Sequence, residues 1–242
     1  MIGRPIIRLD SVVSTQDLLF RLGERGAGEG TTVVARHQSG GRGRGGRAWS
    51  TPPGEALLFS VLFRPRLPPD GLTPFSILIA DALATTLAEK FSIAPTIKWP
   101  NDVLVDGRKI SGVLIQMRSG MAVAGIGLNV LSRRDALPEG ATSLRAEAGR
   151  DIELDDLLHT LLDAIDDRYR ALLFGETREA MNRVQERLYL NGEEVTLQDG
   201  DRVLRGRVRG VRDDGALLLD VGGETRAIVS GELVRGPRRS TS

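Results

Sequence analysis

The chain has 242 residues, 40% of them hydrophobic, which suits one large domain with a small second domain. Its formal net charge of +1 argues against a general electrostatic attraction to nucleic acid or to an anionic membrane. The lack of cysteine excludes disulfides, thiolate catalysis and cysteine-ligated zinc, and two histidines cannot build a histidine-rich metal centre. No apolar run reaches about 18 residues and no signal peptide is visible, so we expect a cytoplasmic protein without membrane contact.

The first half of the chain predicts alternating strands and helices. A short strand at residues 6–9 precedes a helix that Ser14 caps and that stops near Gly26. Two further strands are expected at residues 31–36 and 56–63. Thr73 as cap and Pro74 in the first turn open a second helix, which is apolar on nearly all sides and should be buried.

The second half predicts an antiparallel meander, two helices and a small β-barrel. The meander consists of four strands joined by tight turns: residues 96–99, 102–105, 109–117 and 121–130. Amphipathic helices are expected at residues 152–174 and 177–187. Short strands joined by Gly/Asp turns then fit a barrel, at residues 195–197, 203–211, 216–221 and 225–229. A frayed basic tail ends the chain.

Residues 40–47 contain five glycines and three arginines between two strands. Ordering them should oppose folding by roughly 10 kcal/mol of backbone entropy, which a ligand with several negative charges would offset. Guanidinium groups present forked donors to phosphate or carboxylate. The dinucleotide and P-loop motifs do not fit, because no helix follows and Arg47-Ala48 stands where Lys-Ser/Thr is required. An anion-binding loop that orders over its substrate is favoured over a flexible loop or an RNA-binding segment.

A second cluster of candidate site residues is Lys98-Trp99-Pro100-Asn101-Asp102. By itself this string is what the end of a strand followed by a turn commonly contains. A tight turn at Asp106-Gly107 follows, and the returning strand should place Lys109 beside the Asn101-Asp102 end, within one site. Only three of the 33 cationic residues are lysines, so an ammonium at Lys109 is a weak hint of function. A lysine beside a hairpin is otherwise usually solvated.

Gly125 and Gly127 alternate along one strand, which indicates that another group closely approaches that face. Asn129 at the strand end offers a donor and an acceptor suited to a purine edge, although it is equally a turn residue. Ser14-Thr15-Gln16 is most simply a helix cap, and the same backbone donors also bind carboxylates or phosphates.

Taken in order, these strings resemble the biotin–protein ligase family, over about residues 8 to 235. Each of these motifs alone matches many unrelated sequences, but five of them in the family's order and at its spacing identify the family with high specificity. They are residues 14–16, 38–49, 98–102, 108–112 and 125–129. Gln16, Ala48 and Gln116 differ from the residues that are most frequent at these positions in the family. None of the three differences removes a charge that the chemistry needs. The first ligand motif begins at residue 14, so we expect no winged helix-turn-helix and no DNA binding.

The resemblance implies an α+β fold: a class II aminoacyl-tRNA synthetase-like catalytic domain at residues 1–188, an SH3-like barrel at 189–236 and a tail at 237–242. It implies activation of biotin by ATP and Mg²⁺ to biotinyl-5′-AMP, and transfer to a lysine of a biotin carboxyl carrier protein. The protein would act as a monomer or homodimer.

The resemblance also implies roles for individual residues. Lys109 and Arg44 are the expected catalytic residues. Biotin is expected to contact Ser14, Thr15, Gln16, Gln38, Gly41, Arg42, Gly43, Arg44, Lys109 and Gly112. ATP and the adenylate are expected to contact Arg42, Arg44, Arg47, Trp49, Lys98, Asn101, Asp102 and Asn129. Magnesium would be carried by the triphosphate, with Asp102 as a candidate ligand.

Three alternatives stay open. A lipoate–protein ligase shares the fold and the adenylate chemistry. A nucleic-acid-binding module would use alternating arginines on one strand, although neighbouring aspartates favour a solvated face: Arg202, Arg205, Arg207, Arg209 and Arg212. A catalytically silent sensor of biotin or nucleotide is the third.

Overall fold

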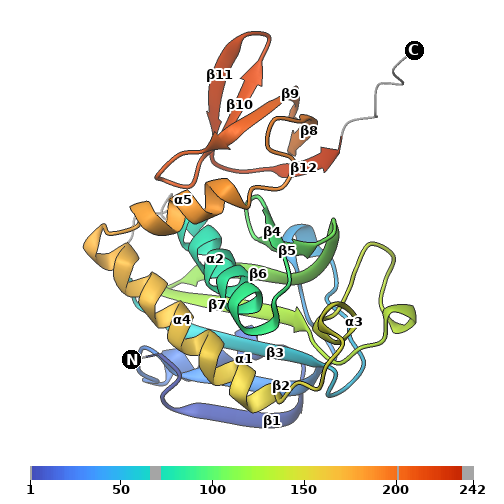
Figure 1. Cartoon of the computed structure of the whole chain (residues 1–242). Helices are drawn as coiled ribbons and strands as arrows, with labels where there is room; N and C mark the ends of the chain where they lie inside the picture. Colours follow the sequence, from blue (N-terminus) through green and yellow to red (C-terminus); the bar gives the residue numbers. More distant parts are fainter. Residues whose placement is uncertain (1, 66–71, 201, 236–242) are drawn as a thin grey trace.

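The computed structural model describes residues 2–65, 72–200 and 202–235. A large sheet with helices on both faces forms the main body, and a small sheet lies beyond helix α5 (Figure 1). The tail expected at residues 237–242 lies outside the described residues.

The large sheet has seven strands in the order β1-β2-β3-β7-β6-β5-β4. Their bounds are Ile6–Val12 (β1), Thr32–Gln38 (β2), Ala56–Phe63 (β3), Pro95–Lys98 (β4), Asp102–Val105 (β5), Arg108–Arg118 (β6) and Met121–Asn129 (β7). The meander predicted for β4 to β7 is confirmed, since each strand pairs antiparallel with the next. Strands β1 and β2 pair in parallel, which requires the crossover that helix α1 (Thr15–Glu24) supplies.

Strand β3 is buried along its whole length because both faces of the sheet are covered there. On one face, Phe59 and Phe63 belong to the main core with helices α2 (Leu72–Phe91) and α4 (Leu154–Phe174). On the other face, Leu62 packs with Leu19 and Phe20 of α1. The predicted burial of α2 is confirmed, and its apolar circumference follows from its central place.

The expected cap of α2 is wrong. The helix begins at Leu72, so Thr73 lies inside it, and the Thr73 hydroxyl donates to the carbonyl of Val229 at 2.9 Å. Helix α5 spans Arg178–Glu186, close to its predicted bounds. The prediction missed the short helix α3 (Leu144–Ala148) and two single 3-10 turns at Arg44–Gly46 and Arg134–Ala136.

The small domain is an open antiparallel sheet in the order β11-β10-β9-β8-β12. Its strands are Glu194–Asp199 (β8), Arg202–Val211 (β9), Leu217–Val221 (β10), Glu224–Ile228 (β11) and Glu232–Arg235 (β12). Within the described ranges β11 and β12 each have one partner and do not pair with each other. The predicted small barrel is therefore not confirmed, since these strands do not close into a barrel within the described ranges, and β12 was not foreseen.

Direct hydrogen bonds join the small sheet to the main body. The indole of Trp99, 1% exposed, donates to the carbonyl of Gly215 at 2.9 Å, and Val211 donates its amide to Gln185 of α5 at 2.9 Å. The backbone of Ile97 also bridges to Leu188. These bonds fix the small sheet beside the end of β4, where the functional side chains gather.

No helix in the described part of the chain combines the length and apolarity needed to cross a lipid bilayer.

Candidate functional site

A cavity of about 460 Å³ opens between the ends of the large sheet and the edge of the small one. Most of the predicted site residues line it: Ser14, Thr15, Gln16, Gln38, Arg42, Gly43, Arg44, Arg47, Trp49, Lys98, Asn101, Asp102, Lys109, Gly112 and Asn129. Gly41 does not line it. A side chain there would meet the carbonyl of Trp49 at 2.6 Å, so Gly41 allows two loop backbones to approach.

The start of α1 forms one end of the cavity. Ser14 caps the helix by accepting from the Asp17 amide at 3.4 Å. The Thr15 amide and hydroxyl donate to Oε1 of Gln38 at 2.7 and 3.0 Å, and the hydroxyl also contacts Ser60 at 2.7 Å. These side chains are largely buried and already partnered, so this end of the cavity is rigid and polar.

Gly125 and Gly127 make room for two site side chains, as their spacing predicted. A Cβ at Gly125 would lie 2.6 Å from Cδ of Gln16, and one at Gly127 would lie 2.4 Å from Cε2 of Trp49. The Gln16 amide donates to the carbonyls of Leu114 and Val123 at 2.8 and 3.1 Å. The predicted close approach at both glycines is confirmed.

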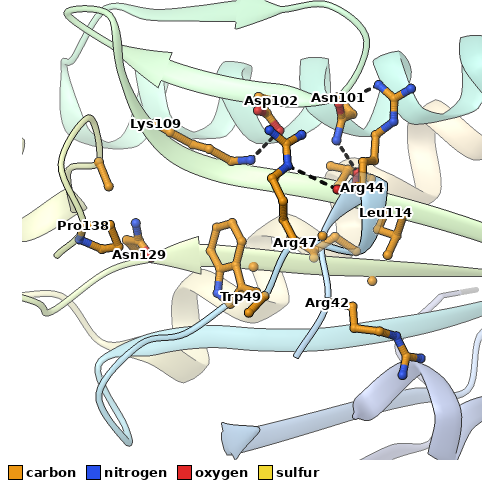
Figure 2. Close-up of a pocket in the computed structure, with 18 of the residues that line it drawn as sticks. Arg42, Arg44, Arg47, Trp49, Asn101, Asp102, Lys109, Leu114, Asn129 and Pro138 are labelled. Carbon is orange, nitrogen blue, oxygen red and sulfur yellow. Dashed lines mark hydrogen bonds and ion pairs between the residues drawn. The ribbon is translucent and has the colours of Figure 1, made fainter. Parts of the chain in front are cut away.

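The loop at residues 40–47 is a tight turn in which Arg42 bridges to Ala48 and Gly43 donates to the Arg47 carbonyl at 2.7 Å. Gly45 and Gly46 have φ of +65° and +76°, a conformation that disfavours other residues. The three arginines diverge. Figure 2 shows Arg42 pointing away from the rest, toward α1, where it pairs with Asp17 at 2.5 Å.

Arg44 and Arg47 point toward the small domain side of the cavity. Arg44 donates to Oδ1 of Asn101 at 3.3 Å, and Arg47 pairs with Glu232 of β12 at 2.6 Å. Burial lowers the pKa of Arg44 below its ordinary value, while the charges of Asp102 and Glu232 act in the opposite direction. A partly desolvated guanidinium of this kind interacts more strongly with an added anion than an exposed one does.

Lys109 and Asp102 face each other across the β5–β6 hairpin (Figure 2), with Nζ 2.7 Å from Oδ1. The prediction that the hairpin returns Lys109 to the Asn101-Asp102 end is confirmed. Gly112 pairs with Asp102 in the register, and a Cβ there would lie 3.0 Å from Nζ. The Lys109 ammonium also lies 5.5 Å from the centre of the Trp49 ring, a favourable cation–π position.

Trp49 and Asn129 form the other end of the cavity. Nδ2 of Asn129 donates to the carbonyl of Thr142 at 3.0 Å, while its Oδ1 is buried and has no hydrogen-bond partner in the described chain. The indole N–H of Trp49 is likewise buried and unpartnered among the described residues. An acceptor and a donor without partners indicate a ligand that supplies both kinds of group.

Several lining residues were not predicted from the sequence. They are apolar strand residues, the segment Pro138–Ala141, and Tyr189, Leu190 and Glu232 at the small domain. The segment has no regular pattern, and Glu232 belongs to the unforeseen strand β12. No local pattern in the sequence pointed to Glu232, because its place depends on how distant strands pair.

Two of the four arginines on β9, Arg207 and Arg209, pair with acids, and so does Arg212 just after the strand. Arg209 lies 2.6 Å from Asp220, Arg207 lies 3.8 Å from Glu194, and Arg212 pairs with Asp214. These pairs support the solvated face that the sequence favoured over a phosphate-binding one.

Comparisons with known proteins agree with this geometry. A model described as "Biotin/lipoate A/B protein ligase family" matches residues 9–131, and one described as "Biotin protein ligase C terminal domain" matches residues 191–236. The chain is 31% identical to the bifunctional ligase/repressor BirA of Bacillus subtilis, over 98% of this chain and 75% of that protein. It is 30% identical to the biotin–[acetyl-CoA-carboxylase] ligase of Mycobacterium tuberculosis, over 94% and 88%.

A similar solved structure is that of biotin protein ligase from Aquifex aeolicus in complex with biotin and ATP. It has a TM-score of 0.85 and 31% identity, and the match covers 96% of this chain and 98% of that one. On these matches and on the site described above, the chain belongs to the biotin/lipoate A/B protein ligase family.

Proposed function

We propose that this protein is an ATP-dependent ligase that activates biotin as biotinyl-5′-AMP and transfers it to a lysine of a biotin carboxyl carrier protein. The observation that carries the proposal is the Lys109 ammonium, placed between the rigid α1 end of the cavity and the end formed by Trp49 and Asn129. The named relatives and the structure with biotin and ATP support biotin as the acid.

The two ends of the cavity suit the two substrates. The α1 end, with Thr15, Gln16 and Gln38, would hold biotin, whose ureido ring offers donors and acceptors. The unpartnered groups of Trp49 and Asn129 would face the adenine, since its edge carries both a donor and acceptors. Lys109 and Arg44 would then lie beside the carboxylate and the phosphates.

Both nucleophiles belong to the substrates. A carboxylate oxygen of biotin attacks the α-phosphorus of ATP, and the bond to pyrophosphate breaks. The neutral amine of the carrier lysine then attacks the acyl carbon, the acyl–oxygen bond breaks, AMP leaves and the amine loses a proton. The enzyme's part is to position these groups and to stabilise the negative charge that grows on oxygen, which fixed cations do best in a site with little water.

Lys109 is the residue best placed to stabilise that charge. Asp102 holds its ammonium at the cavity, and Gly112 leaves it space to move toward a ligand. Arg44, half-buried beside Asn101, would interact with the phosphates, and the loop around it would keep water away from the labile anhydride. The proposal that this loop orders over the substrate rests on its three arginines and paired glycines.

Magnesium would arrive with the triphosphate. The described residues hold no cluster of three or more potential metal ligands, and Asp102 is the lining carboxylate best suited by type and place to be a ligand. When bound, the ion would neutralise phosphate charge.

We also propose that residues 1–188 form the catalytic domain and residues 189–236 the small domain. The mostly antiparallel sheet covered by helices supports a relationship of the catalytic domain to the class II aminoacyl-tRNA synthetases.

The test is a pair of assays on the whole protein. Biotin-dependent exchange of pyrophosphate into ATP should occur, and lipoate in place of biotin should support it at least about tenfold less well. Labelling of an isolated biotin carboxyl carrier domain should then require its single acceptor lysine. Equal exchange with lipoate would assign the protein to the lipoate ligases, and no exchange with either acid would contradict the proposal. RNA binding that falls steeply with salt would favour the nucleic-acid module.

A further inference from the structure

Glu147 is a buried carboxylate of helix α3 that lies outside the cavity and has no part in the reaction described above. Its side chain is 8% exposed. One of its oxygens, Oε1, accepts three hydrogen bonds: from the Thr142 hydroxyl, from Arg108 at 3.2 Å and from Arg134 at 3.0 Å. Such a concentration of donors on one oxygen holds three different chain segments together.

The first of these segments carries Lys109. Arg108 directly precedes Lys109 on β6, and the Lys109 backbone is held on both sides by the segment that contains Thr142. The Lys109 amide donates to the Gly140 carbonyl at 2.8 Å, and the Thr142 amide donates to the Lys109 carbonyl at 2.9 Å. Glu147 thus acts on the Lys109 backbone through Arg108 and through Thr142.

The same segment reaches the other end of the cavity. The carbonyl of Thr142 accepts from Nδ2 of Asn129 at 3.0 Å, and this bond turns the unpartnered Oδ1 of Asn129 the other way. Pro138 to Ala141, just before Thr142, line the cavity wall (Figure 2 shows Pro138 beside Asn129). One residue, Thr142, therefore contacts both Lys109 and Asn129, and Glu147 holds it.

We propose that Glu147 is a positioning residue that fixes the spacing between the Lys109 ammonium and the Asn129 amide. The proposal rests on the proposed function for the identity of the ligands that these groups contact. A displacement of about 1 Å in such a group lowers a rate by roughly a hundredfold. A purely structural role of Glu147, as an anchor for α3, would instead lower stability without separating the two substrates.

The test compares full-length wild type with Glu147→Gln, which keeps the side-chain size and removes the charge. Hydrogen exchange measured by NMR should be at least about tenfold faster at the amides of Lys109 and Thr142. The amide of Val208, which donates to Glu193 in the small domain, should be unchanged. In biotin-dependent pyrophosphate exchange, kcat should fall roughly tenfold to a hundredfold and KM for ATP should rise several-fold, with KM for biotin within about twofold.

Thr142→Val provides an independent arm, because it removes only the hydroxyl that donates to Glu147. Its effects should have the same direction and be smaller, because the Arg108 contact with Glu147 stays. The double variant should be no worse than Glu147→Gln, since the Thr142 hydroxyl acts through Glu147. Glu176→Gln, an exposed glutamate after α4, serves as the matched control and should match wild type.

The proposal would be overturned if hydrogen exchange at the Lys109 amide were unchanged in both variants. It would also be overturned if KM for biotin and KM for ATP rose equally while hydrogen exchange became faster throughout the chain. Should wild type lack pyrophosphate exchange, the proposed function fails, and the amide-exchange arm alone decides whether Glu147 positions Lys109.

Discussion

Adding a methyl group at Gly127 should weaken nucleotide binding and leave biotin binding almost intact. In Gly127→Ala the new Cβ would lie 2.4 Å from Cε2 and 2.6 Å from Cζ2 of Trp49. Since non-bonded carbons prefer at least about 3.5 Å, the indole must move by roughly 1 Å. Overpacking of this kind raises the free energy by about 1–3 kcal/mol, which corresponds to a rise in KM for ATP of roughly fivefold to 150-fold.

Gly125→Ala is the matched variant, two residues away on the same strand and face. Its Cβ would lie 2.6 Å from Cδ of Gln16, whose amide is held by two carbonyls. This variant should raise KM for biotin and leave KM for ATP within about twofold. Both constants come from biotin-dependent pyrophosphate exchange, with calorimetric titration of biotin as a direct check. The reasoning is refuted if both variants raise the same constant, or if neither raises any.

Four further outcomes are expected. Lys109→Ala should slow adenylation by about 10²–10³-fold in a single-turnover assay, because it removes a cation from the developing charge. Arg44→Ala should release biotinyl-adenylate, seen as biotin labelling of bystander proteins, because the loop loses its half-buried contact with Asn101. Asp81→Asn should lower the free energy of unfolding by about 3–5 kcal/mol and Tm by roughly 6–20 °C in calorimetry. The reason is that the fully buried Asp81 carboxylate accepts from Arg168 at 2.7 Å and from Arg183 at 3.2 Å. In urea titrations at several pH values, the stability advantage of wild type over Glu147→Gln should be full above about pH 5 and shrink as the pH falls through the lowered pKa of Glu147. Burial acts to raise that pKa, but hydrogen bonds from Thr142 and Arg108 and the nearby charges hold it below its usual value, so the unfolded state takes up the proton first.

Matched controls exist for three of these changes. Lys90→Ala and Arg36→Ala alter cations outside the cavity, and Asp163→Asn alters an exposed carboxylate on α4. Each should stay within about twofold in rate or about 1 °C in Tm. Two outcomes would contradict the predictions on activity: adenylation at the wild-type rate by the Lys109 variant, and selective labelling by the Arg44 variant. Two would contradict the predictions on stability: an unchanged Tm for Asp81→Asn, and a difference between wild type and Glu147→Gln that does not change with pH.

The sequence predicted the parts of the site that depend on local chemistry. Alternating glycines at 125 and 127 indicated a close approach, and the Asp106-Gly107 turn placed Lys109 beside Asp102. Such features follow from strand periodicity and turn type, which act over a few residues. The apolar run at residues 56–63 predicted a strand in the same way, and β3 has these bounds.

What the sequence missed depends on contacts between distant segments. The turns of the small domain were visible, but whether β11 and β12 meet is decided by sheet twist and packing and not by local pattern. Residues 138–141 carry no periodic signal, and their place is set by backbone bonds to Lys109. The parallel pairing of β1 and β2 likewise depends on how α1 crosses the sheet.

The wall shared by the two sheets has a consequence for motion. The bond from Trp99 to Gly215 and the pair between Arg47 and Glu232 both connect the small sheet to the catalytic body, the second of them at the cavity. A tilt of the small sheet away from the body would stretch both connections together and draw the arginine loop with it. While the exposed pair between Arg47 and Glu232 holds, opening of the loop would require the small sheet to bend with it. Admission of the carrier lysine and retention of the adenylate would then oppose each other along the same motion.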